Sequence, residues 1–248
     1  MFADSALIEI AVIYISSETP WGMRDRVIDA LGDLAHSRFL VYLMGPYKTF
    51  DIDPVLDAAE TEAALDLDQL PENVDFGRLV GADVDLDQQE AVLDLLLFVR
   101  DRLRTDPGVN AFLAIDIDIP LEEMDAGTQS IEFALASNAI VYIVPKIGAN
   151  LGVGIETGSV LEALYREQTA DDGADSDTPA ASQHERVVFV HEDGVRSAMI
   201  AAVTDRWDAR VYSYSDREDL VRQVRLFIRD LARREQRGDL PTLDEESS

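Results

Sequence analysis

The chain has 248 residues, 47% of them hydrophobic, which is enough for one sizeable α/β domain or two small ones. Its 49 acidic and 21 basic residues give a formal net charge of −28, and a surface of that sign repels nucleic acid and anionic membranes. The chain contains no cysteine, which excludes disulfides, thiolate metal sites and cysteine nucleophiles, and its three histidines form no pair at metal-ligand spacing.

The basic residues are almost all arginine, because only Lys48 and Lys146 are lysines. An acid-rich and lysine-poor composition resembles that of salt-adapted cytoplasmic proteins, including those of halophilic archaea. In molar salt the Debye length falls to about 3 Å, which screens the self-repulsion of such a surface. The alternative is an ordinary acidic protein. The composition favours salt adaptation and a cytoplasmic location.

Residues 1–22 allow two interpretations. The apolar run at 6–15 is too short to span a bilayer and has no basic segment before it. Pro20-Trp21-Gly22 is predicted to break the chain just before an amphipathic helix at 23–36. We therefore expect 1–22 to be either an N-terminal arm or an artefact of start-codon choice.

Strands and helices alternate along the rest of the chain, followed by an acidic tail at 237–248. In chain order, the predicted elements are a strand at 38–45, helices at 53–65 and 87–105, a strand at 110–117, a helix at 120–137, a strand at 139–144, a helix at 154–168, a strand at 186–192, a helix at 194–208, a strand at 210–214 and a helix at 216–236. Two acidic insertions at 66–86 and 169–185 show no strong periodicity.

This alternation predicts a single flavodoxin-like α/β domain over 23–236. Five parallel strands with right-handed crossovers favour the order 2-1-3-4-5, with helices on both faces of the sheet. In that order the ligand crevice lies at the carboxyl ends of the first and third strands.

Two glycine-containing loops follow those two strands, "MGPYKTFD" at 44–51 and "PKIGANLGVGIETG" at 145–158. Both lysines of the chain lie within three residues of one of these strand ends. Either they meet an anion such as phosphate, or they offset neighbouring acids. Backbone N–H groups at Gly152 to Gly154, at the start of a predicted helix, add a surface that suits an anion.

The stretch "NLGVGIETG" at 150–158 resembles the nucleophile loop of the nucleoside 2-deoxyribosyltransferase superfamily, with its glycines and acid at Gly152, Glu156 and Gly158. Within that superfamily, the sequence "LGVG" is most similar to the corresponding loop of the 2'-deoxynucleoside 5'-monophosphate N-hydrolase branch. "YLMGPY" at 42–47 resembles the turn after the first strand in the transferase branch.

The resemblance implies cleavage of an N-glycosidic bond in a nucleoside or nucleotide. Glu156 would be the nucleophile, and no metal or organic cofactor would be needed. The substrate would be bound by residues of the two loops, and the lysine count adds the two lysines to this set: Gly45, Pro46, Tyr47, Lys48, Lys146, Asn150, Gly152 and Gly154. Related enzymes often complete their sites from a neighbouring subunit, which makes a homodimer an expected partner state.

The acid that would protonate the leaving base is less clearly indicated. Asp116, Asp118 and Asp125 are candidates by position, and Asp116 is preferred because it ends the predicted second strand. Two departures weaken the resemblance. Asn150 replaces a serine that contacts phosphate, and Asn138 stands just before the third strand, where the family often has an aspartate.

Three alternatives stay open. The fold could belong to a TIR-like NAD glycohydrolase, which also uses a glutamate near this sheet edge. It could be a non-catalytic nucleotide-binding or regulatory module, which the departures at Asn138 and Asn150 favour. Glu156 could also be only an acid in the first turn of a helix, where the helix dipole makes it mildly stabilising.

Overall fold

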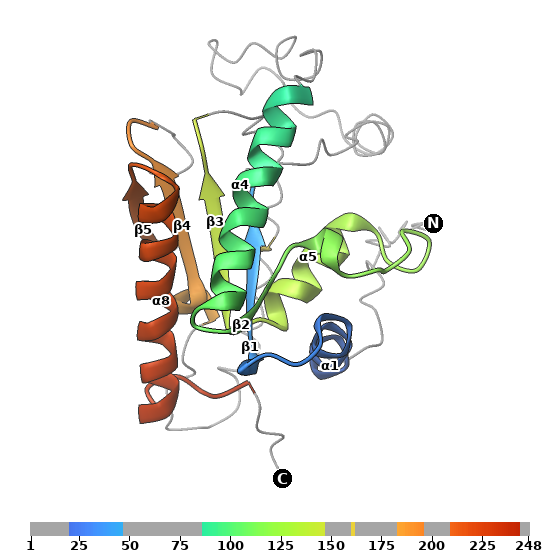
Figure 1. Ribbon diagram of the computed structural model, residues 1–248. Helices are drawn as coiled ribbons and strands as arrows, with labels where there is room; N and C mark the ends of the chain where they lie inside the picture. Colours follow the sequence, from blue (N-terminus) through green and yellow to red (C-terminus); the bar gives the residue numbers. More distant parts are fainter. Residues whose placement is uncertain (1–19, 47–85, 147–159, 162–182, 196–208, 244–248) are drawn as a thin grey trace, which may run out of the picture.

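Five parallel strands form one sheet in the order β2-β1-β3-β4-β5, which confirms the predicted flavodoxin-like topology (Figure 1). The computed structural model describes residues 20–46, 86–146, 160–161, 183–195 and 209–243. The strands are β1 (His36–Met44), β2 (Val109–Phe112), β3 (Ala139–Val144), β4 (Val187–Glu192) and β5 (Arg210–Tyr214). β3 and β5 have the bounds predicted from their β-branched and aromatic runs.

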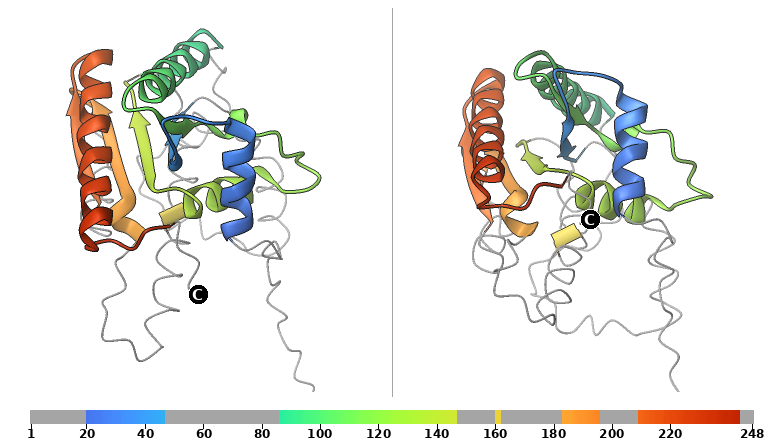
Figure 2. Two further views of the ribbon diagram at one scale, coloured as in Figure 1. Left: turned by 60° about the horizontal axis from the view of Figure 1, so that its bottom comes forward. Right: turned by 90° about the horizontal axis from the view of Figure 1, so that it is seen from below.

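The described helices are α1 (Pro20–Leu31), α4 (Leu86–Thr105), α5 (Ala126–Leu135) and α8 (Arg217–Arg237), and short 3-10 turns occupy Ala114–Asp116 and Gln183–Arg186. α4 and α8 pack against each other on one side, and α1 packs against α5 (Figure 2). Val160 and Leu161 lie in a helical turn and are buried with the α1–α5 group. Helices therefore cover both faces of the sheet, as predicted.

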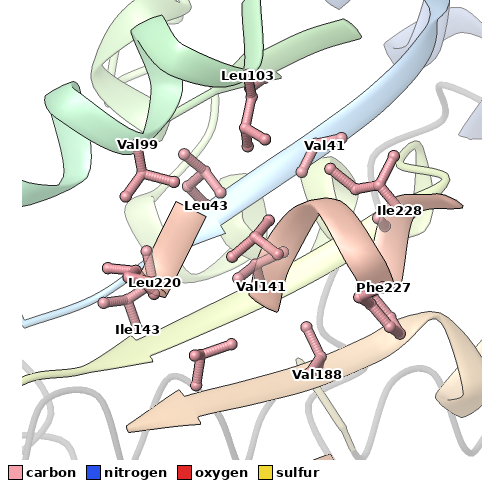
Figure 3. Close-up of a cluster of buried hydrophobic side chains, with 14 of the residues drawn as sticks. Val41, Leu43, Val99, Leu103, Val141, Ile143, Val188, Leu220, Phe227 and Ile228 are labelled. Carbon is pink, nitrogen blue, oxygen red and sulfur yellow. The ribbon is translucent and has the colours of Figure 1, made fainter. Parts of the chain in front are cut away.

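Successive residues of the strands alternate between two apolar cores. Val41 and Leu43 of β1 pack with α4 and α8, and Figure 3 shows them with Val99, Leu220 and Phe227. Leu40, Tyr42 and Met44, at the alternate positions of β1, face the other core together with α1 and α5. Because both faces are buried, the strands read as continuous hydrophobic runs rather than as alternating ones.

Several predicted boundaries were wrong, among them both ends of α1 and the end of β2. α1 begins at Pro20, because proline fits the first position of a helix, so Pro20-Trp21-Gly22 does not break the chain before residue 23. α1 ends at Leu31 instead of residue 36, because Gly32 takes a left-handed conformation with φ +76°. β2 ends at Phe112, because the chain turns into the 3-10 segment that holds Asp116.

The predicted helix at 120–137 is shorter in the structure. α5 begins at Ala126 because the side chain of Asp125 accepts hydrogen bonds from the N–H groups of Gly127 and Thr128. α8 is capped in the same manner by Asp216, and Gly238 ends it in the left-handed conformation. The predicted helix at 53–65, the insertion at 66–86 except its last residue, most of the helices at 154–168 and 194–208, and most of the loop at 169–185 lie outside the described residues.

Candidate functional site

The carboxyl ends of β1 and β3 lie side by side at one edge of the sheet. The two strands are parallel neighbours, and Met44 of β1 is paired with Tyr142 of β3. Gly45 and Pro46 follow β1 directly, as Pro145 and Lys146 follow β3. The two loops that the sequence singles out therefore begin at adjacent positions of the same edge, where ligands of doubly wound sheets bind.

Gly45 is needed for packing at this edge. A Cβ atom added to it would lie 3.1 Å from a methyl carbon of Leu96 in α4 and 3.2 Å from the carbonyl oxygen of Ile143 in β3. Pro46 is buried next to it. The Gly-Pro pair thus lets the end of β1 fit between α4 and β3, whatever else it does for a ligand.

Lys146 is exposed at the start of the loop after β3, with about half of its side-chain surface accessible. Its ammonium group lies 3.5 Å from a carboxylate oxygen of Glu192, and its backbone N–H donates to the other oxygen at 2.9 Å. Lys146 therefore forms an ion pair with one acid, on the strand next to β3. The pair is partly exposed, so an anionic ligand can compete for the ammonium group.

Glu192 was not among the site residues predicted from the sequence. The signal that could have found it is its place as the last residue of the predicted strand "RVVFVHE", at the carboxyl edge of the sheet. Its charge also reaches Tyr214, the last residue of β5. Burial, and then the charge of Glu192, raise the pKa of the Tyr214 phenol, which therefore stays protonated. Among the described residues no hydrogen-bond partner reaches the Tyr214 hydroxyl.

Asp116, the preferred acid partner, does not end a strand. Its carboxylate accepts the backbone N–H of Leu113 at 2.9 Å and pairs with Arg100, while Arg104 lies 3.4 Å away. Both arginines come from α4, so Asp116 fastens the 3-10 turn after β2 to that helix. The prediction that Asp116 ends the second strand was wrong. β2 ends four residues earlier, because hydrogen bonds within the 3-10 turn begin there.

The other two candidate acids lie in the segment between β2 and α5. Asp118 is exposed. Asp125 caps α5 and accepts a further hydrogen bond from the Thr128 hydroxyl at 2.6 Å. Burial acts to raise the pKa of Asp125, but the hydrogen bonds from Thr128 and Gly127 outweigh it, and the pKa is lowered. Asp125 is therefore suited to capping a helix rather than to donating a proton.

Asn138 lies at the amino end of β3, away from the carboxyl edge. Its side-chain oxygen accepts from Arg24 and from the backbone N–H of Leu40, both at 3.0 Å, and its amide nitrogen donates to Glu235 at 3.0 Å. Its carbonyl oxygen accepts from Arg186. An amide can accept and donate at once, which an ionised aspartate cannot. Asn138 therefore has a structural explanation, and its departure from the family pattern does not bear on the ligand edge.

Six predicted site residues lie outside the described residues, and the glycine that completes the motif, Gly158, lies there with them. They are Tyr47, Lys48, Asn150, Gly152, Gly154 and Glu156. Of the predicted site, the structure brings Gly45, Pro46 and Lys146 to one edge and assigns Asp116 to a structural turn.

Within the described part of the chain, no group of three or more histidine, aspartate or glutamate side chains is arranged to hold a metal ion. No helix in that part is both long and apolar enough to cross a membrane.

Comparison with known proteins shows a family but no characterised relative. No curated protein matches the chain, and no solved structure matches it. Residues 24–244 match the model of a family described as a domain of unknown function, DUF7509. This match begins inside α1 and extends past α8, so it covers the whole of the sheet. The chain belongs to the DUF7509 family.

Proposed function

We propose that the protein cleaves the N-glycosidic bond of a nucleoside or nucleotide, or transfers its sugar, with Glu156 as the nucleophile. The observation that carries this proposal is the adjacency of β1 and β3, which start the two motif loops at the same edge of the sheet. A strand order that reverses direction between β1 and β3 opens a crevice at that edge. The motif with Glu156 begins six residues after the end of β3.

Charge at this edge supports an anionic substrate such as a nucleoside monophosphate. Lys146 carries a positive charge at the rim of a protein whose net charge is −28. Its ion pair with Glu192 is partly exposed and contributes on the order of 1 kcal/mol or less, so a phosphate group can displace it. In the proposed reaction, a carboxylate beside the anomeric carbon stabilises the oxocarbenium-like transition state.

A nucleotide-binding module without catalysis is the second candidate, and one observation favours it. Protonation of the leaving base needs an acid within hydrogen-bond reach of the substrate. The oxygens of Asp116 are already engaged by Leu113, Arg100 and Arg104, so Asp116 is not available for that task. The two candidates therefore differ in whether the base is released.

Turnover separates the two candidates. The protein is incubated in molar KCl, which we expect an acidic, salt-adapted chain to need, with a panel of deoxynucleosides, their 5'-monophosphates and NAD. Released base or nicotinamide is followed by chromatography. NAD is included because a TIR-like glycohydrolase would release nicotinamide from it. We expect base release from a monophosphate and its loss, by about a thousandfold or more, in Glu156→Gln, which removes the nucleophile.

The matched control is Glu122→Gln, the same substitution at an exposed glutamate outside the two loops, which is expected to keep full activity. If nothing is released but nucleotides still raise the melting temperature, the binding module is supported and the enzyme is not. If nucleotides neither react nor bind, both candidates fail. Light scattering of the same samples tests the homodimer that the resemblance implies.

A further inference from the structure

α8 is strongly basic in an otherwise acidic protein. It contains seven arginines and four acidic residues, while the chain as a whole has a net charge of −28. One third of the 21 basic residues of the chain therefore lie in a single helix of 21 residues. Its apolar side is buried against the sheet, as the packing of Leu220, Phe227 and Ile228 in Figure 3 shows. The arginine side chains of α8 are exposed or partly exposed.

A groove of about 710 Å³ runs along α8, beside the amino ends of β1 and β2 and the turn at Asp106 and Pro107. Its apolar lining comes from all of these elements: Phe39, Pro107, Val109, Leu226, Ile228 and Ala232. Leu226 is half exposed there. Cavities of about 300–1,000 Å³ with a mostly apolar lining and a few polar groups are typical of sites for small organic molecules.

Three arginines of α8 line this groove, at positions 222, 225 and 229. Arg225 is held by Asp106, through an ion pair of 3.2 Å and a hydrogen bond of 2.9 Å to its carbonyl oxygen. Arg222 pairs with Asp219 at 2.5 Å. For Arg229, no described carboxylate lies within ion-pair distance. Its guanidinium group is thus a positive charge in the groove that no described acidic side chain neutralises.

The acidic residues of the groove do not cancel this charge, because each has its own partner. Asp106 pairs with Arg225, and Glu218 pairs with Arg102 at 2.6 Å. Glu235 pairs with the buried Arg186 at 2.6 Å. The groove therefore combines apolar side chains with a cation, Arg229, that has no ion-pair partner among the described residues.

We propose that this groove binds a small amphipathic organic anion, with its apolar body against Phe39 and Ile228 and its acidic group on Arg229. A second copy of the chain fits less well, because a two-fold contact through this face would bring identical arginines together. The groove lies at the amino ends of the strands, whereas the proposed catalytic loops follow the carboxyl ends of β1 and β3. This proposal is therefore independent of the N-glycosidase proposal.

Calorimetric titration with octanoate tests this proposal, with 1-octanol and acetate as the probes that lack the charge and the apolar body. The titration is done at the lowest KCl concentration at which the protein stays folded, because salt screens the charge. We expect octanoate to bind, and octanol and acetate to bind about tenfold more weakly or not at all. Arg229→Gln should weaken octanoate binding by about five- to tenfold, since it removes a charge-assisted contact.

Arg233→Gln is the matched control, because Arg233 is an exposed arginine of the same helix that does not line the groove. It should leave octanoate binding within about twofold of the wild type. Ala232→Met is a second variant that fills the apolar lining with a good helix former, and it should weaken octanoate binding without unfolding the protein, as circular dichroism will show.

Three results would overturn the proposal. The first is that octanoate does not bind at all, and the second is that octanol binds as tightly as octanoate. The third is that Arg233→Gln weakens octanoate binding as much as Arg229→Gln does. The last result would mean that octanoate responds to the general charge of α8 and not to this groove.

Discussion

The two ends of the sheet use charged residues in different ways. At the amino end, Arg186 is 1% exposed and pairs with Glu235, and Asn138 joins both of them to Arg24 of α1. At the carboxyl end, the pair of Lys146 and Glu192 is partly open to solvent. Charges that are buried and bonded several times hold helices and strands together, while an exposed pair costs little to rearrange. The comparison separates charges that hold the fold together from an exposed charge pair that can rearrange to meet a ligand.

The largest expected effect is the loss of the buried cation at the amino end. Arg186→Met should lower the free energy of unfolding by about 3–5 kcal/mol, because Glu235 is left as an uncompensated buried charge. Denaturant unfolding in molar KCl measures this change. Arg186→Met combined with Glu235→Leu removes both charges and should lose less than the single variant. An equal loss in the two variants would show that packing, and not the ion pair, holds this end together.

Asn138→Asp is expected to destabilise the protein by about 1–3 kcal/mol, although the two side chains have nearly the same shape. The aspartate can still accept from Arg24 and Leu40, but it cannot donate to Glu235, which lies 3.0 Å from the amide nitrogen. The thermal unfolding midpoint and the denaturant midpoint both report the change. A variant as stable as the wild type would mean that the amide donor is not needed.

Asp125→Ala should cost about 1 kcal/mol at neutral pH, because it removes the cap of α5, which carries the chain back from the carboxyl end of β2 to β3. The pKa of Asp125 is lowered in the folded protein, so the cap contributes fully above the ordinary aspartate pKa and is lost as the pH falls through the lowered value. The stability difference between wild type and variant should therefore shrink on acidification, as denaturant midpoints at decreasing pH will show.

Asp118→Ala is the control for this pH dependence, because Asp118 is exposed and caps no helix. Its stability should stay within about 0.5 kcal/mol of the wild type at each pH. A stability difference for Asp125→Ala that stays constant down to low pH would contradict the assignment of the ionised carboxylate as the cap.

Lys146→Gln has the smallest expected effect on stability, within about 1 kcal/mol, because its ion pair with Glu192 is partly exposed. If the carboxyl end binds the nucleotide, the same variant should reduce the rise in melting temperature caused by a nucleoside monophosphate. Arg233→Gln removes one positive charge from α8, outside the two loops, and should not change that rise in melting temperature. A large loss of stability in Lys146→Gln would remove the contrast between the two ends of the sheet.

The sequence alone was sufficient for the fold class and for most elements of the sheet. β3 and β5 have the predicted bounds, α4 differs from its prediction by one residue at one end, and α8 differs by one residue at each end, because long apolar periods and β-branched runs are local signals. The strand order followed from the alternation of strands and helices. The ends of elements were harder to predict from the sequence. The end of β2, for example, depends on the hydrogen bond from the Leu113 N–H to the Asp116 carboxylate.

What only the tertiary structure decided is which polar residues are structural. In the sequence, Asp116 looks like an acid at the end of a strand and Asn138 like a changed site residue. Asp116 is instead bound by arginines 12 and 16 residues before it, and Asn138 by partners 97, 98 and 114 residues away. Such contacts depend on how α4, α1 and α8 pack on the sheet, which no local pattern encodes. The adjacency of the two motif loops could be read from the strand order, whereas the roles of the charges around them required the packed fold.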